Sequence, residues 1–223
     1  MRYQLVIFDW DGTVMDSVDK IVNCLQMAAV SCGVAIPSAE VAKSIIGLSL
    51  DIAVATLFPN EQEKWSALAE AYKHQHKEVD TTPTPLFADV RNTLTALKAA
   101  GIKLAVATGK NRAGLDRMLE KSATRAFFCT TRTADEAESK PHPQMLLDIL
   151  AETGIAAADA VMVGDTKIDM QLARNAGIDA IGVTFGVDTA DTLAAYQPVA
   201  IVDSYQQLAA VLQHKHVNAE VCQ

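Results

Sequence analysis

The stretch LVIFDWDGTVMDS, residues 5–17, decides how the rest of the sequence is interpreted. Its four apolar residues, 5–8, are typical of a buried strand, and they end abruptly in Asp9 and Asp11, two carboxylates separated by Trp10. Ionised carboxylates repel each other and are costly to bury without a compensating positive charge. We therefore expect Asp9 and Asp11 to face a positive charge that this stretch of sequence does not supply.

The chain has 223 residues, a formal net charge of −8 and a hydrophobic content of one half. It is long enough to bury a large core, either as one domain or as a core domain with an insertion. The acidic balance, with no local Lys/Arg cluster, disfavours nucleic acid and anionic membranes as partners. The N-terminal residues resemble neither a signal peptide nor a membrane span, so the sequence predicts a cytoplasmic protein, either a monomer or a homodimer.

The cysteines and histidines form no pattern typical of a metal site. The four cysteines lack C-x-x-C spacing and are expected to be reduced and structural. They are Cys24, Cys32, Cys129 and Cys222. Two His-x-His pairs place imidazoles two residues apart, where side chains on a helix do not face each other, so solvated surface histidines are expected. The pairs are His74 with His76 and His214 with His216.

Short apolar runs alternate with helical patterns along most of the chain. The runs span residues 5–8, 102–107, 160–164 and 180–183. The helical patterns between them end at glycines, which suit a helix C-terminus. This alternation predicts an α/β fold with a doubly wound, Rossmann-like parallel sheet that is covered by helices on both faces.

Residues 16–82 interrupt this alternation. They contain helical patterns at 17–33, 38–47 and 61–79, without a convincing strand, and lead into the Pro-rich segment 81–87. We therefore expect two domains. Residues 1–15 and 83–223 form the α/β core, and residues 16–82 form a helical domain inserted after the first strand.

Polar motifs follow the expected strands at the edge where open parallel sheets bind ligands. ATGK begins at the last residue of the second run, and GDTKID begins at the last residue of the third. SKPHP places Lys140 before a helical pattern. Each motif alone is weak, because a D-x-D pair or a Thr-Gly is most often a turn and a Lys before Pro usually lies on the surface. Together, and in this order, they predict one crevice lined with carboxylates, a hydroxyl and a lysine.

The motifs DWDGT, ATGK, SKPHP and GDTKID resemble, in order, the four motifs of the haloacid dehalogenase superfamily of phosphohydrolases, over nearly the whole chain. The resemblance implies that Asp9 is the nucleophile and Asp11 the general acid/base. It implies that Mg²⁺ is bound by Asp9, by Asp165 and by the backbone carbonyl of Asp11, with Asp169 supporting the water shell of the metal. Trp10 departs from the small or aliphatic residue expected there, and we expect it to pack beneath the loop. The phosphate-binding residues would be Gly12, Thr108, Gly109 and Lys140.

Elementary chemistry supports these roles independently. A close pair of like unit charges costs roughly 4 kcal/mol at an effective dielectric constant near 20, so clustered carboxylates and a phosphate dianion require a divalent cation and Lys140. Oxygen ligands that leave several waters in place suit Mg²⁺ better than zinc. Attack by a carboxylate on phosphorus divides hydrolysis into two easier steps, and Asp11 can protonate the leaving alcohol and later deprotonate water. Gly12 lets backbone N–H groups approach the phosphate.

Three alternatives remain beside the phosphatase. A dehalogenase needs no acid for its leaving halide, so Asp11 argues against that reaction. A phosphomutase of the beta-phosphoglucomutase type would use the same core and stays open. A phospho-receiver domain also clusters acids, a hydroxyl and a lysine on a doubly wound sheet, but it is about half this length and its acids precede the Thr and Lys. Multiple-turnover phosphate release would separate the enzyme from the receiver.

The helical insertion resembles the first type of cap in this family, and this cap is where the substrate would be read. The segment AKSIIGLSLD carries Lys43, Ser44 and Gly47 in the stretch that faces the core in similar phosphatases. Lys43 is a candidate for a substrate carboxylate, although an exposed helical lysine is the simpler interpretation. The expected partner is a small phosphorylated metabolite, with phosphoglycolate as the leading candidate and a generic organophosphate as the safer one.

Overall fold

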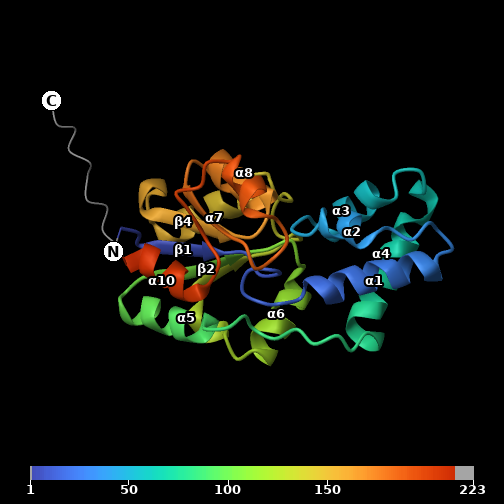
Figure 1. Ribbon diagram of the computed structural model, residues 1–223, viewed down its shortest axis with the longest axis horizontal. Helices are drawn as coiled ribbons and strands as arrows, with labels where there is room; N and C mark the ends of the chain where they lie inside the picture. Colours follow the sequence, from blue (N-terminus) through green and yellow to red (C-terminus); the bar gives the residue numbers. More distant parts are fainter. Residues whose placement is uncertain (1, 214–223) are drawn as a thin grey trace.

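The computed structural model describes residues 2–213 as a six-stranded parallel sheet between helices, with a helical insertion after the first strand (Figure 1). The strands are β1 (Leu5–Phe8), β2 (Lys103–Ala107), β3 (Thr130–Arg132), β4 (Ala160–Gly164), β5 (Asp179–Val183) and β6 (Ala200–Val202). Their order in the sheet is β3-β2-β1-β4-β5-β6. This is a doubly wound order, in which the direction of winding reverses beside β1, and it confirms the predicted fold class.

Both faces of the sheet are buried, which explains why the central strands are apolar without alternation. Val6 and Phe8 belong to the core on one face, and Leu5 and Ile7 belong to the core on the other. The first face is covered by α5 (Val90–Ala99), α6 (Arg112–Lys121) and α10 (Tyr205–Gln213). The second is covered by α7 (Gln144–Thr153), α8 (Lys167–Ala176) and α9 (Ala190–Ala194). Figure 1 shows α5 and α10 on one side of the sheet and α7 and α8 on the other.

Two three-residue strands at the sheet edges, β3 and β6, were not predicted. Thr130-Thr131-Arg132 is polar, and Ala200-Ile201-Val202 is too short to show a periodicity, so neither gives a strand signal by itself. The predicted helix ends are confirmed where a glycine takes the left-handed conformation. Gly154 after α7 and Gly177 after α8 both have φ = 68°.

The helical insertion between β1 and β2 forms its own apolar clusters beside the sheet (Figure 1). It consists of α1 (Val18–Ser31), α2 (Ala39–Lys43), α3 (Leu50–Leu57), a 3₁₀ turn (Gln62–Lys64), α4 (Trp65–His74) and a π turn (Gln75–Val79). The helix expected over 38–47 ends early, at Lys43. It is followed by turns that lead to Gly47, whose φ is 103°, outside the helical range. The helix expected over 61–79 is divided into a 3₁₀ turn, α4 and the π turn.

The two chain segments that connect the insertion to the sheet are bonded to each other. The Asp16 amide donates to the Pro85 carbonyl at 2.9 Å, and the buried Lys20 ammonium donates to the Asp80 carbonyl at 2.5 Å. We propose that the boundaries between core and cap lie at these crossings, near residues 15 and 83.

The predictions about cysteines, histidines and membrane spans can also be compared with the structure. Cys24, Cys32 and Cys129 are free thiols, as predicted. Cys222, His214 and His216 lie outside the described residues. Among residues 2–213, no helix is long and apolar enough to cross a membrane.

Candidate active site

Asp9 follows β1 at the centre of the sheet and is almost completely buried, at 1% exposure. Its amide donates to the Val163 carbonyl of β4 at 2.9 Å, which fixes the backbone where the side chain turns into the site. The Oδ1 atom accepts a hydrogen bond from the Lys140 ammonium at 2.8 Å, whereas the buried Oδ2 atom has no hydrogen-bond partner among residues 2–213. Half of this carboxylate is therefore desolvated and uncompensated.

Lys140 lies between two buried carboxylates. Its ammonium is 2.8 Å from Asp9 Oδ1 and 2.7 Å from Asp169 Oδ1, and its side chain is fully buried. Burial by itself would lower the pKa of Lys140, but the charges of Asp169 and Asp9 outweigh it and raise the pKa above its usual value. Lys140 therefore stays charged and holds the carboxyl end of β1 to the start of α8.

Asp165 follows β4 and is held by donors from two other loops. The Thr13 hydroxyl donates to Asp165 Oδ1 at 2.7 Å, and the Val187 amide donates to Oδ2 at 2.9 Å. Burial, followed by the charges of Asp169 and Asp9, raises the pKa of Asp165 well above its usual value. Burial likewise raises the pKa of Asp9 to about 7, against the opposing effect of Lys140. Both carboxylates are thus poised to gain from a nearby cation.

Asp9, Asp165 and Asp169 form a buried group in which one oxygen of each lies within 4.8 Å of the others. Three carboxylates face the single ammonium of Lys140, and the unpartnered Asp9 Oδ2 adds a second reason for a missing positive charge. The oxygen-only donor set fits a hard divalent cation. Within this group, Asp169 accepts the most hydrogen bonds, because Oδ1 accepts from Lys140 and Oδ2 accepts from both the Thr166 hydroxyl at 2.6 Å and the Thr166 amide at 3.2 Å.

Two glycines make room for the Asp165 carboxylate. A Cβ atom at Gly12, whose φ is 77°, would lie 2.2 Å from Asp165 Oδ2, and one at Gly186 would lie 2.1 Å from the same atom. Any side chain at either position would displace the carboxylate. The loop after β5, which carries Gly186 and Val187, was not predicted from the sequence to belong to the site. Its position directly after an expected strand was the available signal.

Asp11 is engaged by two side chains to which no role was assigned from the sequence. The Ser17 hydroxyl donates to Oδ1 at 2.5 Å, and the Lys110 ammonium lies 2.9 Å from Oδ2. Asp11 is 7% exposed, so it lies at the border between the buried carboxylates and the cavity. Lys110 ends the ATGK motif, so its place at the end of β2 gave a signal for this contact.

Thr108 and Gly109 lie where the helical insertion touches the sheet. Thr108 is buried, and its Oγ1 accepts a hydrogen bond from the Lys110 amide at 3.2 Å. A Cβ atom at Gly109 would lie 2.5 Å from the Leu48 carbonyl oxygen, so only glycine permits this approach. A second contact joins the same parts, because the Ser49 amide donates to the Ser139 hydroxyl at 2.9 Å. The loop after α2 is therefore closed over the end of β2.

A cavity of about 630 Å³ lies between the carboxyl ends of the strands and the helical insertion. Asp9, Asp11, Thr108 and Gly109 line it from the sheet side. Gly47 lines it from the insertion, whereas Lys43 is not among its lining residues. The volume is in the range of small-molecule sites.

Two expectations about side chains have opposite outcomes. Trp10 is fully buried and packs edge-on against Phe128, with ring centroids 6.2 Å apart, as expected for a residue beneath the loop. The expectation of solvated histidines holds for exposed His74 but is wrong for His76. The π turn after α4 brings His76 against Tyr72, with ring centroids 5.7 Å apart, and into the cavity lining.

The family model described as "Haloacid dehalogenase-like hydrolase" matches residues 6–183, most of the chain and all four motifs. The chain belongs to this family. The match confirms the resemblance inferred from the four motifs of the haloacid dehalogenase-like hydrolases.

Similar proteins of this family cover nearly the same length. The haloacid dehalogenase-like chain is 36% identical to "Probable phosphatase IndB" of Dickeya dadantii (strain 3937), over 92% of this chain and 91% of the relative. It is 31% identical to "Phosphoglycolate phosphatase" of Aliivibrio fischeri (strain ATCC 700601 / ES114), over 94% and 96% of the two chains. A crystal structure of a haloacid dehalogenase-like protein from Bacteroides fragilis superposes with a TM-score of 0.86 at 26% identity, covering 92% of this chain and 99% of that one.

Proposed function

We propose that this haloacid dehalogenase-like hydrolase is a Mg²⁺-dependent phosphatase that acts on a small organophosphate monoester, with phosphoglycolate as the leading substrate candidate. The observation that carries the proposal is the buried Asp9 carboxylate, which is bonded to Lys140 through one oxygen and lacks any partner for the other. The similar proteins from Dickeya and Aliivibrio, a phosphatase and a phosphoglycolate phosphatase by their descriptions, support the same reaction class.

In the proposed reaction, a carboxylate oxygen of Asp9 attacks phosphorus and the bond to the leaving alcohol breaks. Asp11 gives its proton to the departing oxygen, and the phosphoryl group is left on Asp9. Asp11 then takes a proton from water, which attacks the same phosphorus and releases inorganic phosphate, so that both side chains return to their first state. Lys140 and Thr108, with Gly12 and Gly109 leaving the backbone accessible, hold the phosphoryl oxygens.

Asp9, Asp165 and the backbone carbonyl of Asp11 would hold Mg²⁺, with Asp169 outside the first ligand shell. When bound, Mg²⁺ supplies positive charge to the transferring oxygens. The closed loop around Gly47 would exclude bulk water from the phosphorylated aspartate.

The test is turnover of p-nitrophenyl phosphate with Mg²⁺ and after exhaustive chelation by EDTA. We expect inorganic phosphate to be released over many turnovers, and activity to disappear with the metal and return on its addition. Asp9→Asn should abolish phosphoenzyme formation in a single-turnover experiment, because an amide is a poor nucleophile. Undiminished turnover in EDTA would contradict the role of the metal.

A phosphomutase of the beta-phosphoglucomutase type is the alternative, since it would use the same four core motifs. The two reactions differ in the fate of the phosphoryl group. A phosphatase releases it to water, whereas a mutase returns it to a sugar phosphate. Isomerisation of a hexose phosphate without release of inorganic phosphate would favour the mutase.

A further inference from the structure

The cavity beyond the carboxylates has an apolar wall formed by the helical insertion. Ile21 and Leu25 of α1, Ile45 and Ile46 after α2, and Tyr72 of α4 line this wall. The four aliphatic side chains pack within the insertion and expose only 2–7% of their surface, so they present a closed apolar face that a leaving group as short and polar as glycolate would not match. The wall instead fits a leaving group with an apolar body, whose burial on binding is favourable.

Cationic side chains line another part of the same cavity. They come from the insertion and from the core: Lys73, Lys77, Lys110 and Arg117. Three of them are compensated by carboxylates. Lys73 pairs with Glu70 at 2.7 Å, Lys77 with Glu78 at 2.9 Å, and Lys110 with Asp11 at 2.9 Å.

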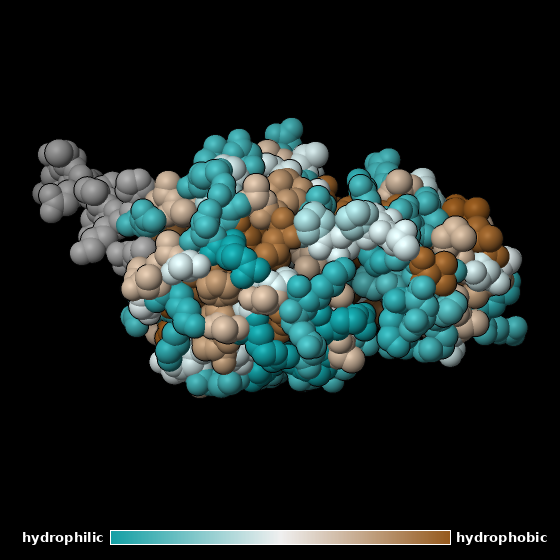
Figure 2. Space-filling view, turned by 90° about the horizontal axis from the view of Figure 1, so that it is seen from below, coloured by the Kyte–Doolittle hydropathy of each residue, from teal (hydrophilic) through white to brown (hydrophobic). Residues whose placement is uncertain are grey.

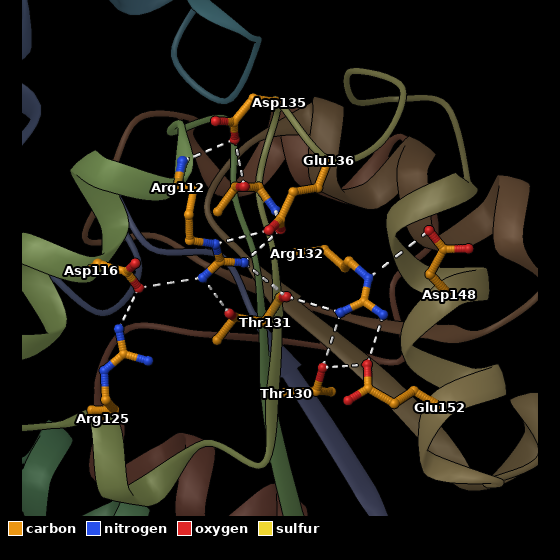
Figure 3. A network of polar contacts seen from close by, with 11 residues as sticks. Arg112, Asp116, Arg125, Thr130, Thr131, Arg132, Asp135, Glu136, Asp148 and Glu152 are labelled. Atoms are coloured by element: carbon orange, nitrogen blue, oxygen red, sulfur yellow. Dashed lines mark hydrogen bonds and ion pairs between the residues drawn. The ribbon is translucent and has the colours of Figure 1, made fainter.

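Arg117 differs from these lysines, because within residues 2–213 the structure records no hydrogen bond or ion pair of its side chain. The neighbouring carboxylate, Asp116, is occupied elsewhere (Figure 3). It pairs with Arg125 and with Arg112, the latter at 3.4 Å, on the side of α6 that faces β3. Arg112 in turn donates to Glu136 at 2.9 Å, so Asp116 and Glu136 are engaged in this network. Arg117 is left as an exposed guanidinium that lines the cavity without a direct partner among residues 2–213, and the carboxylate of Glu78, which feels its charge, is paired with Lys77.

The position of Arg117 on α6 relates it to the proposed phosphate site. Ala113, Gly114 and Arg117 are three and four residues apart and line the cavity together, so they share one face of the helix. Arg117 lies five residues after the start of α6, about 7.5 Å along its axis, and helical side chains lean back toward the N-terminus. The N-terminus of α6 follows Thr108 and Gly109 directly. Arg117 therefore lines the same cavity as Thr108 and Gly109 but is displaced along α6 from the phosphate end.

The environment of His76 is consistent with an excess of positive charge in this region. Burial, followed by the charge of Lys110, lowers the pKa of His76 to about 4. Lys20 and Arg117 act in the same direction, and Asp11 opposes them. An anion placed here would compensate these charges.

We propose that Arg117 is a specificity-determining residue that binds an anionic group, a carboxylate or a phosphate, at the far end of the leaving group. The apolar body of this leaving group lies on the apolar wall of the cavity. This inference rests on the proposed phosphatase function and, in place of phosphoglycolate, favours phosphate monoesters with an apolar body and a terminal anion as its substrates. A planar guanidinium suits either anion, because it can donate two parallel hydrogen bonds.

Three phosphate esters test separately the apolar body and the terminal anion of the leaving group. Phenyl phosphate has the body without the anion, phosphoglycolate has the anion without the body, and 4-carboxyphenyl phosphate has both. We expect kcat/KM to be highest for 4-carboxyphenyl phosphate. Arg117→Gln should lower its kcat/KM by roughly 10- to 100-fold, the usual effect of losing a charged hydrogen bond, with a much smaller change for phenyl phosphate. Arg174→Gln is the matched control, because Arg174 is an exposed arginine on α8 outside the cavity lining.

The results distinguish failure of this inference from failure of the proposed function. Hydrolysis of phenyl phosphate without a preference for the carboxylated ester, or equal losses in Arg117→Gln and Arg174→Gln, would overturn the role of Arg117 and leave the phosphatase intact. If no ester is hydrolysed, the function fails. Binding of 4-phosphonobenzoate and phenylphosphonate, measured by calorimetry, then still decides the subsite. Tighter binding of the carboxylated compound that is lost in Arg117→Gln would support it, and equal affinities would overturn it.

Discussion

Lys140→Met removes the ammonium that lies between Asp9 and Asp169 and keeps a side chain of similar length. Lys140 is fully buried, and its two contacts measure 2.8 and 2.7 Å, so no water replaces the lost charge without rearrangement. Breaking a buried ion pair by removing one partner typically costs about 3–5 kcal/mol. For a chain of this size each kcal/mol lowers Tm by roughly 2–4 °C. We therefore expect Tm of the metal-free variant to fall by roughly 6–20 °C.

The loss should depend on pH with a defined sign. Burial raises the pKa of Asp9 to about 7 even with Lys140 present, and removal of the ammonium raises it further. A carboxyl whose folded pKa lies above its unfolded value stabilises the fold less as pH rises from the unfolded pKa toward the folded one. The variant can protonate Asp9 at pH 5, whereas at pH 8 the charge of the buried Asp9 carboxylate is left uncompensated. The Tm deficit should accordingly be larger at pH 8 than at pH 5.

The assay is thermal unfolding in EDTA at both pH values, followed by near-UV circular dichroism. Lys121→Met is the matched control, because Lys121 is exposed at the end of α6. Adding Asp169→Asn to Lys140→Met should recover part of the loss, since one buried charge then disappears with its partner. A deficit equal to that of Lys121→Met, or one larger at pH 5, would refute the electrostatic reasoning.

Three further outcomes are expected. Asp11→Asn should reduce single-turnover phosphorylation about 10²- to 10⁴-fold with an alkyl phosphate. The loss should be much smaller with p-nitrophenyl phosphate, because its leaving group, p-nitrophenolate, departs as a stable anion. Equal losses with the two substrates would exclude the acid role of Asp11. Mg²⁺ should raise Tm more at pH 8 than at pH 5, because the pKa values of Asp9 and Asp165 are raised and protonated carboxyls do not bind the cation, so equal shifts would count against this site. Gly109→Ala should push the loop at Leu48 away and raise KM, with faster amide exchange at Ser49; unchanged exchange would show that the closed contact is not maintained.

The surface of the helical insertion also carries apolar residues that do not belong to the cavity, and Figure 2 shows brown patches on this part of the molecule. Met27 and Val30 of α1 are 45% and 52% exposed, and Ile36 after it is 58% exposed. Scattered exposed apolar residues are normal on protein surfaces, so they carry no assignment.

The core of the site could be predicted because its residues adjoin the strands. Asp9, Thr108 and Asp165 each come directly after an apolar run, and parallel strands bring their carboxyl ends to one edge of the sheet. Local sequence therefore determined the four central strands and the residues at their carboxyl ends. Lys140 does not follow a strand, and it was placed in the crevice by its position before a helical pattern together with the family motif.

Other features depend on how distant segments pack, and only the tertiary structure decided them. The contact of Gly109 with Leu48 and the approach of Gly186 to Asp165 join segments that are far apart in the chain, and no local pattern encodes them. His76 was expected to be solvated because it lies two residues from His74, where helical side chains do not face each other, yet it lines the cavity in the π turn. Arg117 is one of many helical arginines in sequence terms. Arg117 lines the cavity because one face of α6 borders it, and Arg117 lacks the carboxylate of Asp116 because Asp116 pairs with Arg125 and Arg112. Side-chain partners of this kind are set by the docking of whole elements, which sequence periodicity does not specify.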